Sequence, residues 1–134
     1  MLSNILDLIR IKDWLKNIIL FFPLIFSGQL LYIKNHQNIF IIFFIFCLSA
    51  SIIYIINDIL DFESDRLHPI KKNSKPIASK RISLSLAKKL LFCISLILII
   101  LLFFNQEIFL HVLVYMVINL IYNFYLKKIA VVDI

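Results

Sequence analysis

The amino-acid sequence predicts an all-α protein, built as a polytopic bundle of membrane-spanning helices. Of its 134 residues, 62% are hydrophobic, whereas about half is usual in soluble domains. Long apolar stretches alternate with short charged segments, which is the pattern of helices that cross a bilayer. A soluble domain could not bury so much apolar surface, so we expect a single membrane domain over residues 1–134.

Four segments are predicted to cross the membrane, each near the length that spans roughly 30 Å of hydrocarbon. The first is interrupted by Pro23 and Gly28 and follows Trp14, which is placed to anchor at the interface. Ser83 and Ser85 can cap the third helix. The predicted spans are about residues 17–33, 38–62, 88–104 and 108–126.

The distribution of basic residues predicts the orientation. Thirteen of the fourteen Lys and Arg residues lie before the first span, between the second and third, or after the fourth, and only Lys34 lies on the other side. Because basic loops face the cytoplasm, we expect both termini there, in a bacterial inner (plasma) membrane. The net charge of +6 follows from this topology. No pattern of stacking and basic residues indicates a nucleic-acid partner.

Three aspartates, Asp58, Asp61 and Asp65, follow the second apolar stretch. On a helix, positions i, i+3 and i+7 lie within roughly 60° of one another, whereas Glu63 falls on nearly the opposite side. Carboxylates gathered at the end of a membrane helix repel one another unless a cation joins them. The spacing therefore predicts a metal site in which these catalytic aspartates hold Mg²⁺ with a phosphorylated substrate.

A basic loop follows the aspartates and is expected to contact the phosphate oxygens that the metal leaves unneutralised. Prolines at 69 and 76 interrupt helix formation and constrain this loop. The alternative is a solvated, positively charged cytoplasmic loop, with His68 capping a turn in place of binding phosphate. The candidate residues are Arg66, His68, Lys75 and Arg81.

Two further regions offer polar side chains. Lys16 and Asn17 precede the first span, where they could reach the same anion or serve as interfacial anchors. Tyr115, Asn119 and Tyr122 share one face of the fourth span, and either line a substrate cavity or hydrogen-bond a neighbouring helix. The sequence contains no nucleophile with its base, no glycine-rich phosphate loop and no zinc-ligand cluster.

The aspartate segment resembles the UbiA-type superfamily of intramembrane prenyltransferases, whose first aspartate-rich motif reads Asn-Asp-x-x-Asp-x-x-x-Asp. Asn57 and the three aspartates fill this motif without a gap. The sequence is also similar to one branch of the superfamily, the decaprenyl-phosphate phosphoribosyltransferases, in its Lys-x-Trp-x-Lys-Asn segment at residues 12–17 and its Asp-Arg-x-His-Pro segment at residues 65–69.

Two more segments of that branch are matched with departures. Its Arg-Pro-Ile-Ala-Ser-Gly segment corresponds to residues 75–80, with Lys75 in place of Arg and Lys80 in place of Gly. Its Tyr-Ser-x-x-Leu-Lys segment corresponds to residues 122–127, with Asn123 in place of Ser. The second match implies that Tyr122 and Lys127 contact the substrate.

The resemblance implies a Mg²⁺-dependent enzyme that transfers phosphoribosyl from 5-phosphoribosyl diphosphate to polyprenyl (decaprenyl) phosphate for cell-envelope glycan synthesis. Alternatives are an aromatic prenyltransferase of a quinone or haem pathway, acting on a prenyl diphosphate and an aromatic acceptor, and a catalytically silent membrane fragment. Members of the superfamily have about nine transmembrane helices and a second aspartate-rich motif. The chain is therefore expected to be the amino-terminal part of that fold, with a separate C-terminal half as one candidate partner.

Overall fold

The structure, a computed structural model, describes residues 1–28 and 38–125. Within these ranges the chain is helical and contains no β-strand, which confirms the all-α prediction. The helices, with η marking 3₁₀ segments, are α1 (Leu2–Ile9), η1 (Ile11–Phe21), α2 (Phe22–Phe26), α3 (Asn38–Leu60), α4 (Phe62–Leu67), α5 (Lys71–Ser74), α6 (Leu84–Phe104), η3 (Gln106–Ile108) and α7 (Phe109–Phe124).

Three helical segments in the described residues are long and apolar enough to cross a membrane: α3, α6 and the continuous stretch Gln106–Phe124. They correspond to the second, third and fourth predicted spans. At about 1.5 Å per residue, the 23 residues of α3 exceed the thickness of the hydrocarbon layer. The first predicted span is described only as far as residue 28, as η1 and α2, and its crossing stays a prediction.

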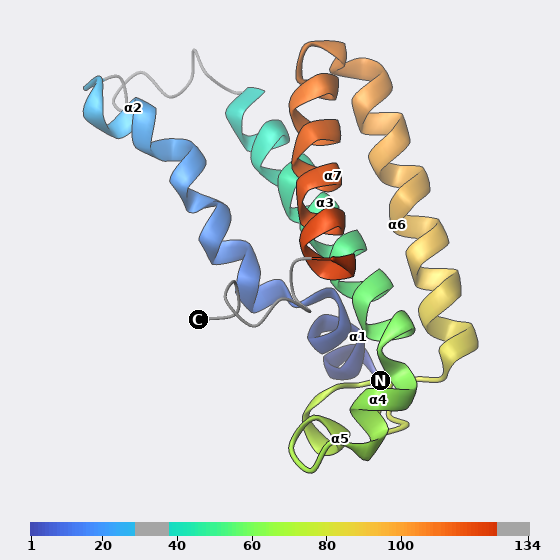
Figure 1. Ribbon diagram of the computed structural model, residues 1–134. Helices are drawn as coiled ribbons and strands as arrows, with labels where there is room; N and C mark the ends of the chain where they lie inside the picture. The colour runs from blue at the N-terminus through green and yellow to red at the C-terminus, as the bar shows by residue number, and fades with distance from the viewer. Residues whose placement is uncertain (29–37, 126–134) are drawn as a thin grey trace.

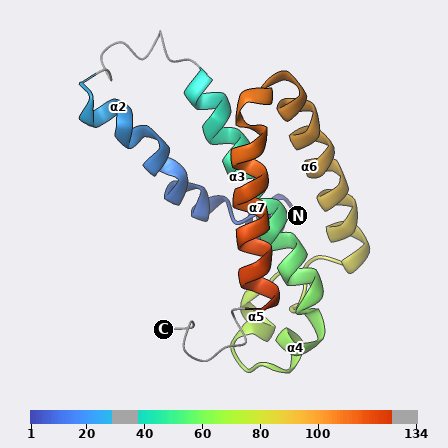
Figure 2. The ribbon, with the colours of Figure 1, turned by 45° about the horizontal axis from the view of Figure 1, so that its top comes forward.

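Helix α3 is the central element of the bundle. Helices α6 and α7 run antiparallel to each other along it, while η1 starts beside the middle of α3 and its ribbon, followed by α2, diverges from that of α3 (Figures 1 and 2). The hydrophobic core gathers around α3 and contains Leu8, Ile45, Leu48, Ile52, Ile55, Ile77, Ile82, Ala87, Ile94, Leu98 and Val112.

The start of α6 confirms the predicted cap. The Ser83 hydroxyl accepts a hydrogen bond from the Leu86 amide at 3.2 Å, so Ser83 is the cap. Ser85 is the second residue of the helix. A side-chain oxygen at this position satisfies one of the amides that a helix leaves unpaired at its first turn. The cap fixes where the chain leaves the basic loop and enters the third predicted span.

Polar side chains attach η1 to α3. The Trp14 indole donates to the Ser51 hydroxyl at 3.0 Å, and Ser51 in turn donates to the Ile9 carbonyl at 2.9 Å. The Asn17 amide donates to Cys47 Sγ at 3.3 Å. Trp14 and Asn17 therefore pack against α3, because α3 offers small polar partners at the same depth.

The segment between α4 and α6 folds back into the bundle. Ile77 and Ile82 belong to the core, Ala78 is buried, and the Ile82 amide donates to the Pro76 carbonyl at 3.1 Å. Buried apolar residues thus hold the backbone of this basic loop in place, so the loop is constrained as the prolines predict. At its turn Lys80 takes a left-handed backbone conformation, with φ 60°.

Replacing Lys80 with glycine should stabilise the protein by up to about 1 kcal/mol. A left-handed conformation costs an L-residue roughly 1–2 kcal/mol, of which the greater entropy of glycine in the unfolded chain offsets a part. Unfolding by titration with SDS measures the change. Lys72→Gly, which removes the same charge from helix α5, is the control and should destabilise. A less stable Lys80→Gly protein would contradict the strain argument.

Candidate functional site

The aspartate motif lies at the junction of α3 and α4. Helix α3 ends at Leu60, and Asp61 adopts φ −84° and ψ 4° before α4 begins. Helical hydrogen bonds nevertheless continue across the break, from the Asp61 amide to the Asn57 carbonyl at 2.9 Å and from the Asp65 amide to the Asp61 carbonyl at 2.8 Å. The predicted helical spacing of the motif is therefore kept through a local distortion.

Lys75 joins two of the three aspartates. Its Nζ atom lies 2.9 Å from Asp58 Oδ1 and 2.6 Å from Asp65 Oδ2, and both aspartates are only 2% exposed. Burial lowers the pKa of Lys75, but hydrogen bonds to Asp65 and Asp58 outweigh it and raise that pKa above 10.5. At neutral pH the chain itself thus supplies a cation between these carboxylates.

Arg10 is the second cation at this pair, and in the sequence nothing sets it apart from the other basic residues. Its Nη2 atom lies 3.1 Å from Asp58 Oδ1, and its guanidinium lies 4.5 Å from the centroid of the Tyr54 ring. Arg10 ends helix α1 in a left-handed conformation with φ 55°. Because 48 residues separate Arg10 from Asp58, no periodicity in the sequence could pair them.

One carboxylate oxygen at this site lacks a partner. Asp58 Oδ2 is buried and accepts no hydrogen bond from the residues that the structure describes. A buried carboxylate oxygen without a partner is costly, and such groups often mark the place of an ion or a water molecule. Carboxylate oxygens are preferred ligands of Mg²⁺, so the residues present fit a divalent cation at Asp58.

Asp61 lines a different cavity. A cleft of about 230 Å³ between α3 and α7 is bordered by Asn57 and Asp61 on one side and by Asn123 on the other. Within residues 1–28 and 38–125, no group of three or more His, Cys, Asp or Glu side chains is placed to hold a metal ion. The described residues thus do not show the expected grouping of three aspartates around one metal: Lys75 contacts Asp58 and Asp65, while Asp61 lines the separate cleft.

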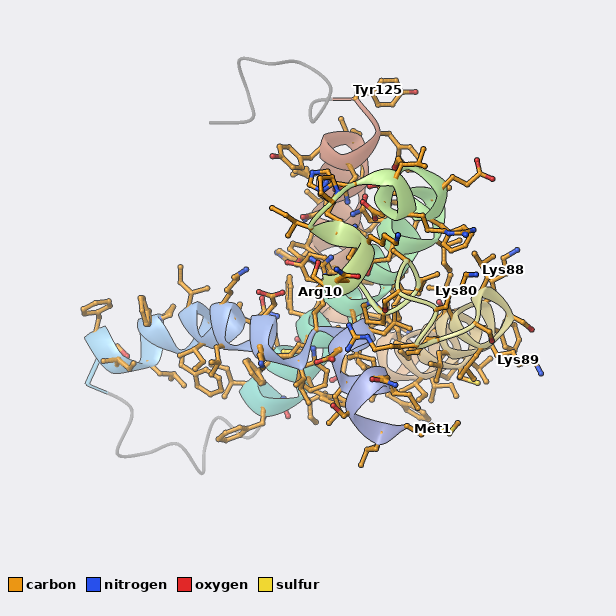
Figure 3. The ribbon with its side chains drawn as sticks, turned by 90° about the horizontal axis from the view of Figure 1, so that it is seen from below. Met1, Arg10, Lys80, Lys88, Lys89 and Tyr125 are labelled. Atoms are coloured by element: carbon orange, nitrogen blue, oxygen red, sulfur yellow. The ribbon has the colours of Figure 1, made fainter. Side chains whose placement is uncertain are left out.

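Asp58, one of the two buried aspartates, borders a polar cavity of about 560 Å³. It lies between the amino-terminal segment and the loop that follows α5, at the lower end of Figure 1. From below, Arg10 lies near the middle of this end of the molecule, whereas Lys88 and Lys89 extend outward at its edge (Figure 3). The residues that line the cavity are Asp7, Arg10, Asp13, Asp58, Ser74, Lys75, Pro76 and Arg81.

Arg81 ties α1 to the loop. Its Nη1 atom lies 3.1 Å from Asp7 Oδ2, its Nη2 donates to the Ser74 carbonyl at 2.7 Å, and its Nε donates to the Ser79 hydroxyl at 3.0 Å. The guanidinium fork of Arg suits several fixed acceptors at once. Arg81 thus lines the cavity, as its candidate role in anion binding requires. It also joins the two segments, α1 and the loop, that border the cavity.

Substituting Arg81 with methionine should loosen α1 while leaving the bundle folded. We expect a loss of about 1 kcal/mol and at least several-fold faster hydrogen exchange in residues 1–10. Hydrogen exchange followed by mass spectrometry measures this locally. Arg66→Met is the matched control, since the Arg66 guanidinium lies only over the Phe62 ring, 5.5 Å from its centroid. Unchanged exchange in α1 would show that Arg81 does not hold it.

The other candidate residues that the structure describes have contacts of their own. Lys16 Nζ pairs with Asp13 at 2.6 Å, a hydrogen bond that raises the pKa of Lys16. His68 Nδ1 accepts hydrogen bonds from the amides of residues 70 and 71 at 3.2 and 3.3 Å, and so caps a turn. Tyr122 is more than a third exposed and does not line the cleft beside Asp61. Lys127 lies outside the described residues.

The fold and the site define an integral membrane protein with a buried carboxylate pair and a basic loop at one end of its central helix. The model of the UbiA prenyltransferase family matches residues 18–134. The chain belongs to this family.

Several curated proteins are similar to the chain. Decaprenyl-phosphate phosphoribosyltransferase of Mycolicibacterium smegmatis is 33% identical across the whole chain, which covers 43% of that protein. The protein of the same name from Mycobacterium tuberculosis is 30% identical over 59% of the chain and 27% of its own length. Nodulation protein NoeC of Azorhizobium caulinodans is 34% identical over 55% of the chain and 24% of its own length. The chain thus spans less than half the length of each of these relatives.

Proposed function

We propose that the chain is part of a membrane transferase that moves phosphoribosyl from 5-phosphoribosyl diphosphate to a polyprenyl phosphate. The observation that carries the proposal is the buried pair Asp58 and Asp65: one oxygen of Asp58 has no partner among the described residues, and Asp58 borders a polar cavity that Arg10, Lys75 and Arg81 also line. The similarity across the whole chain to a decaprenyl-phosphate phosphoribosyltransferase supports this choice of substrates.

In this proposal Asp58, Asp61 and Asp65 hold Mg²⁺. The metal would neutralise the diphosphate that leaves while positive charge builds on the anomeric carbon of the ribose. The chain's own cations supply the remaining charge: Arg10, Lys75 and Arg81 border the same cavity and can contact phosphate oxygens. Asn57 lines the neighbouring cleft with Asp61, where an amide can orient the substrate by hydrogen bonding.

The polyprenyl tail would lie in the bilayer along the apolar helices, so that only its phosphate reaches the site. Its oxygen then attacks the anomeric carbon as the diphosphate departs. The aspartates and the basic loop lie at the same end of the bundle (Figure 1), and the distribution of basic residues favours the cytoplasm for this end. Phosphoribosyl diphosphate, a soluble anion, would enter from there.

The test supplies membranes with labelled phosphoribosyl diphosphate and polyprenyl phosphate and follows label into lipid. Membranes would hold the chain alone or together with the carboxyl-terminal part of the Mycolicibacterium relative, and membranes without the chain are the control. Mg²⁺-dependent labelled lipid in either sample supports the proposal. No labelled lipid in both samples would overturn it and favour a catalytically silent membrane module.

The family match also favours a second candidate, transfer of a prenyl group to an aromatic acceptor. That reaction would use the same metal site, with the diphosphate carried by the prenyl chain. A parallel sample with labelled prenyl diphosphate and an aromatic acceptor separates the two reactions. A prenylated product in this sample, without phosphoribosyl lipid in the other, would assign the second activity.

A further inference from the structure

Lys75 stands where a bound cation would be expected. Its ammonium contacts Asp58 at 2.9 Å and Asp65 at 2.6 Å, and its side chain is only 14% exposed. One positive charge faces two buried carboxylates, so Lys75 by itself balances half of their charge. Arg10 adds a second contact to Asp58, whereas Lys71 lies 3.9 Å from Asp65.

One carboxylate oxygen of the site, Asp58 Oδ2, has no partner among the described residues. Both cations at Asp58 contact Oδ1, while Oδ2 is buried. Lys75 gives each carboxylate one short contact, whereas a divalent cation can bind several carboxylate oxygens at once. Lys75 and Arg10 thus balance the charge of the two carboxylates, but the bonding of Asp58 Oδ2 is incomplete, and a divalent cation can supply the missing contact.

The cavity beside Lys75 offers space for its displaced ammonium. The polar cavity of about 560 Å³ is bordered by Lys75 itself and by Arg10 and Arg81. The residues after Lys75, from Pro76 to Ala78, are buried and hold the backbone. The long side chain can therefore rotate into the cavity while its backbone stays in place.

We propose that Lys75 is an exchangeable internal counter-ion of the aspartate motif. A divalent cation replaces its ammonium between Asp58 and Asp65, and the displaced ammonium moves into the polar cavity. There it joins Arg10 and Arg81 and contacts the phosphate oxygens of the diphosphate. This inference rests on the proposed function for the identity of the anion. It also predicts the order of binding: the metal binds first, because it frees the Lys75 ammonium that then contacts the diphosphate.

The exchange can be measured on the wild-type chain without any substrate. The protein, in nanodiscs of phosphatidylcholine, would be treated with an amine-acylating reagent, and acylation at each lysine would be quantified by mass spectrometry. We expect Mg²⁺ to increase the rate of acylation at Lys75 by at least several-fold. Lys72, which is exposed, serves as the internal reference and should not change. Samples of equal ionic strength in NaCl control for screening.

Binding of Mn²⁺, followed by electron paramagnetic resonance in parallel samples, separates the possible results. Bound Mn²⁺ with Lys75 still protected overturns the exchange and leaves the proposed transferase standing. Absence of bound Mn²⁺ also overturns the exchange, while the lipid-labelling assay decides the transferase independently. Faster acylation at Lys75 together with bound Mn²⁺ supports the exchange.

A variant gives a second measurement. In Lys75→Met no ammonium has to be displaced, so Mg²⁺ should raise the unfolding midpoint of this variant by more than it raises that of the wild type. An equal or smaller rise contradicts the exchange. If the variant does not fold, acylation of the wild-type chain decides the question.

Discussion

Replacing Lys75 with methionine should destabilise the protein by about 3–5 kcal/mol in the absence of divalent cations. The change leaves Asp58 and Asp65, both 2% exposed, without the ammonium that contacts each of them. Removing one partner of a buried ion pair leaves an uncompensated charge, and losses of that size are usual. Arg10 still contacts Asp58, so Asp65 should account for most of the loss.

Unfolding by titration with SDS measures this effect. Lys72→Met is the matched control, since it removes the same charge from an exposed position of α5, and its effect should stay within about 0.5 kcal/mol. Adding Asp65→Asn to Lys75→Met should recover part of the stability, because the second change removes the unpaired charge. A Lys75→Met protein as stable as the wild type would show that the buried pair does not depend on this lysine.

The second large effect concerns catalysis. We expect Asp61→Ala to reduce the formation of labelled lipid by at least about 10²–10³-fold, the usual cost of losing a group that stabilises charge in the transition state. Asp61 is the middle member of the motif and lines the cleft that Asn57 and Asn123 share. In the proposed function it is one of the three aspartates that would hold the metal, and it lines this cleft.

The same membranes and labelled substrates measure the loss. Glu63→Ala is the control, because Glu63 is an exposed acidic residue of α4 two positions away, and its activity should equal that of the wild type. Asp61→Asn keeps the shape of the side chain and removes its charge, and should be as inactive as Asp61→Ala. Activity that survives in Asp61→Ala would remove Asp61 from the metal site.

The sequence was a good guide to the helices and to the residues that gather at one end. Hydrophobic run lengths located α3, α6 and α7, because a membrane helix must satisfy its backbone internally and cover it with apolar side chains. Ser83 was predicted as a cap because capping depends on residues within one turn of the chain. Lys80 stands where the phosphoribosyltransferase branch has glycine, and the backbone at this position is left-handed, a conformation that glycine adopts easily.

The partners within the site could not be read in the same way. Helical spacing predicts three aspartates on one face, but the loop that carries Lys75 brings its ammonium to Asp58 and Asp65, whereas Asp61 lines a separate cleft. The sequence predicts an anion as the ligand of Lys75 and Arg81, and the structure adds that each contacts an acidic residue of the chain. The sequence contains fourteen basic residues, and no feature of the neighbouring sequence distinguishes those whose side chains contact the buried aspartates.

By itself, then, the sequence determined an all-α membrane protein, the positions of its long helices and the aspartate motif at the end of α3. These follow from hydrophobicity and short-range spacing, which act within a few turns of the chain. Only the tertiary structure decided that Arg10 and Lys75 neutralise the buried aspartates and that one oxygen of Asp58 is left over. Those pairings depend on how the amino-terminal segment and the loop after α5 fold back onto α3, and packing sets that geometry.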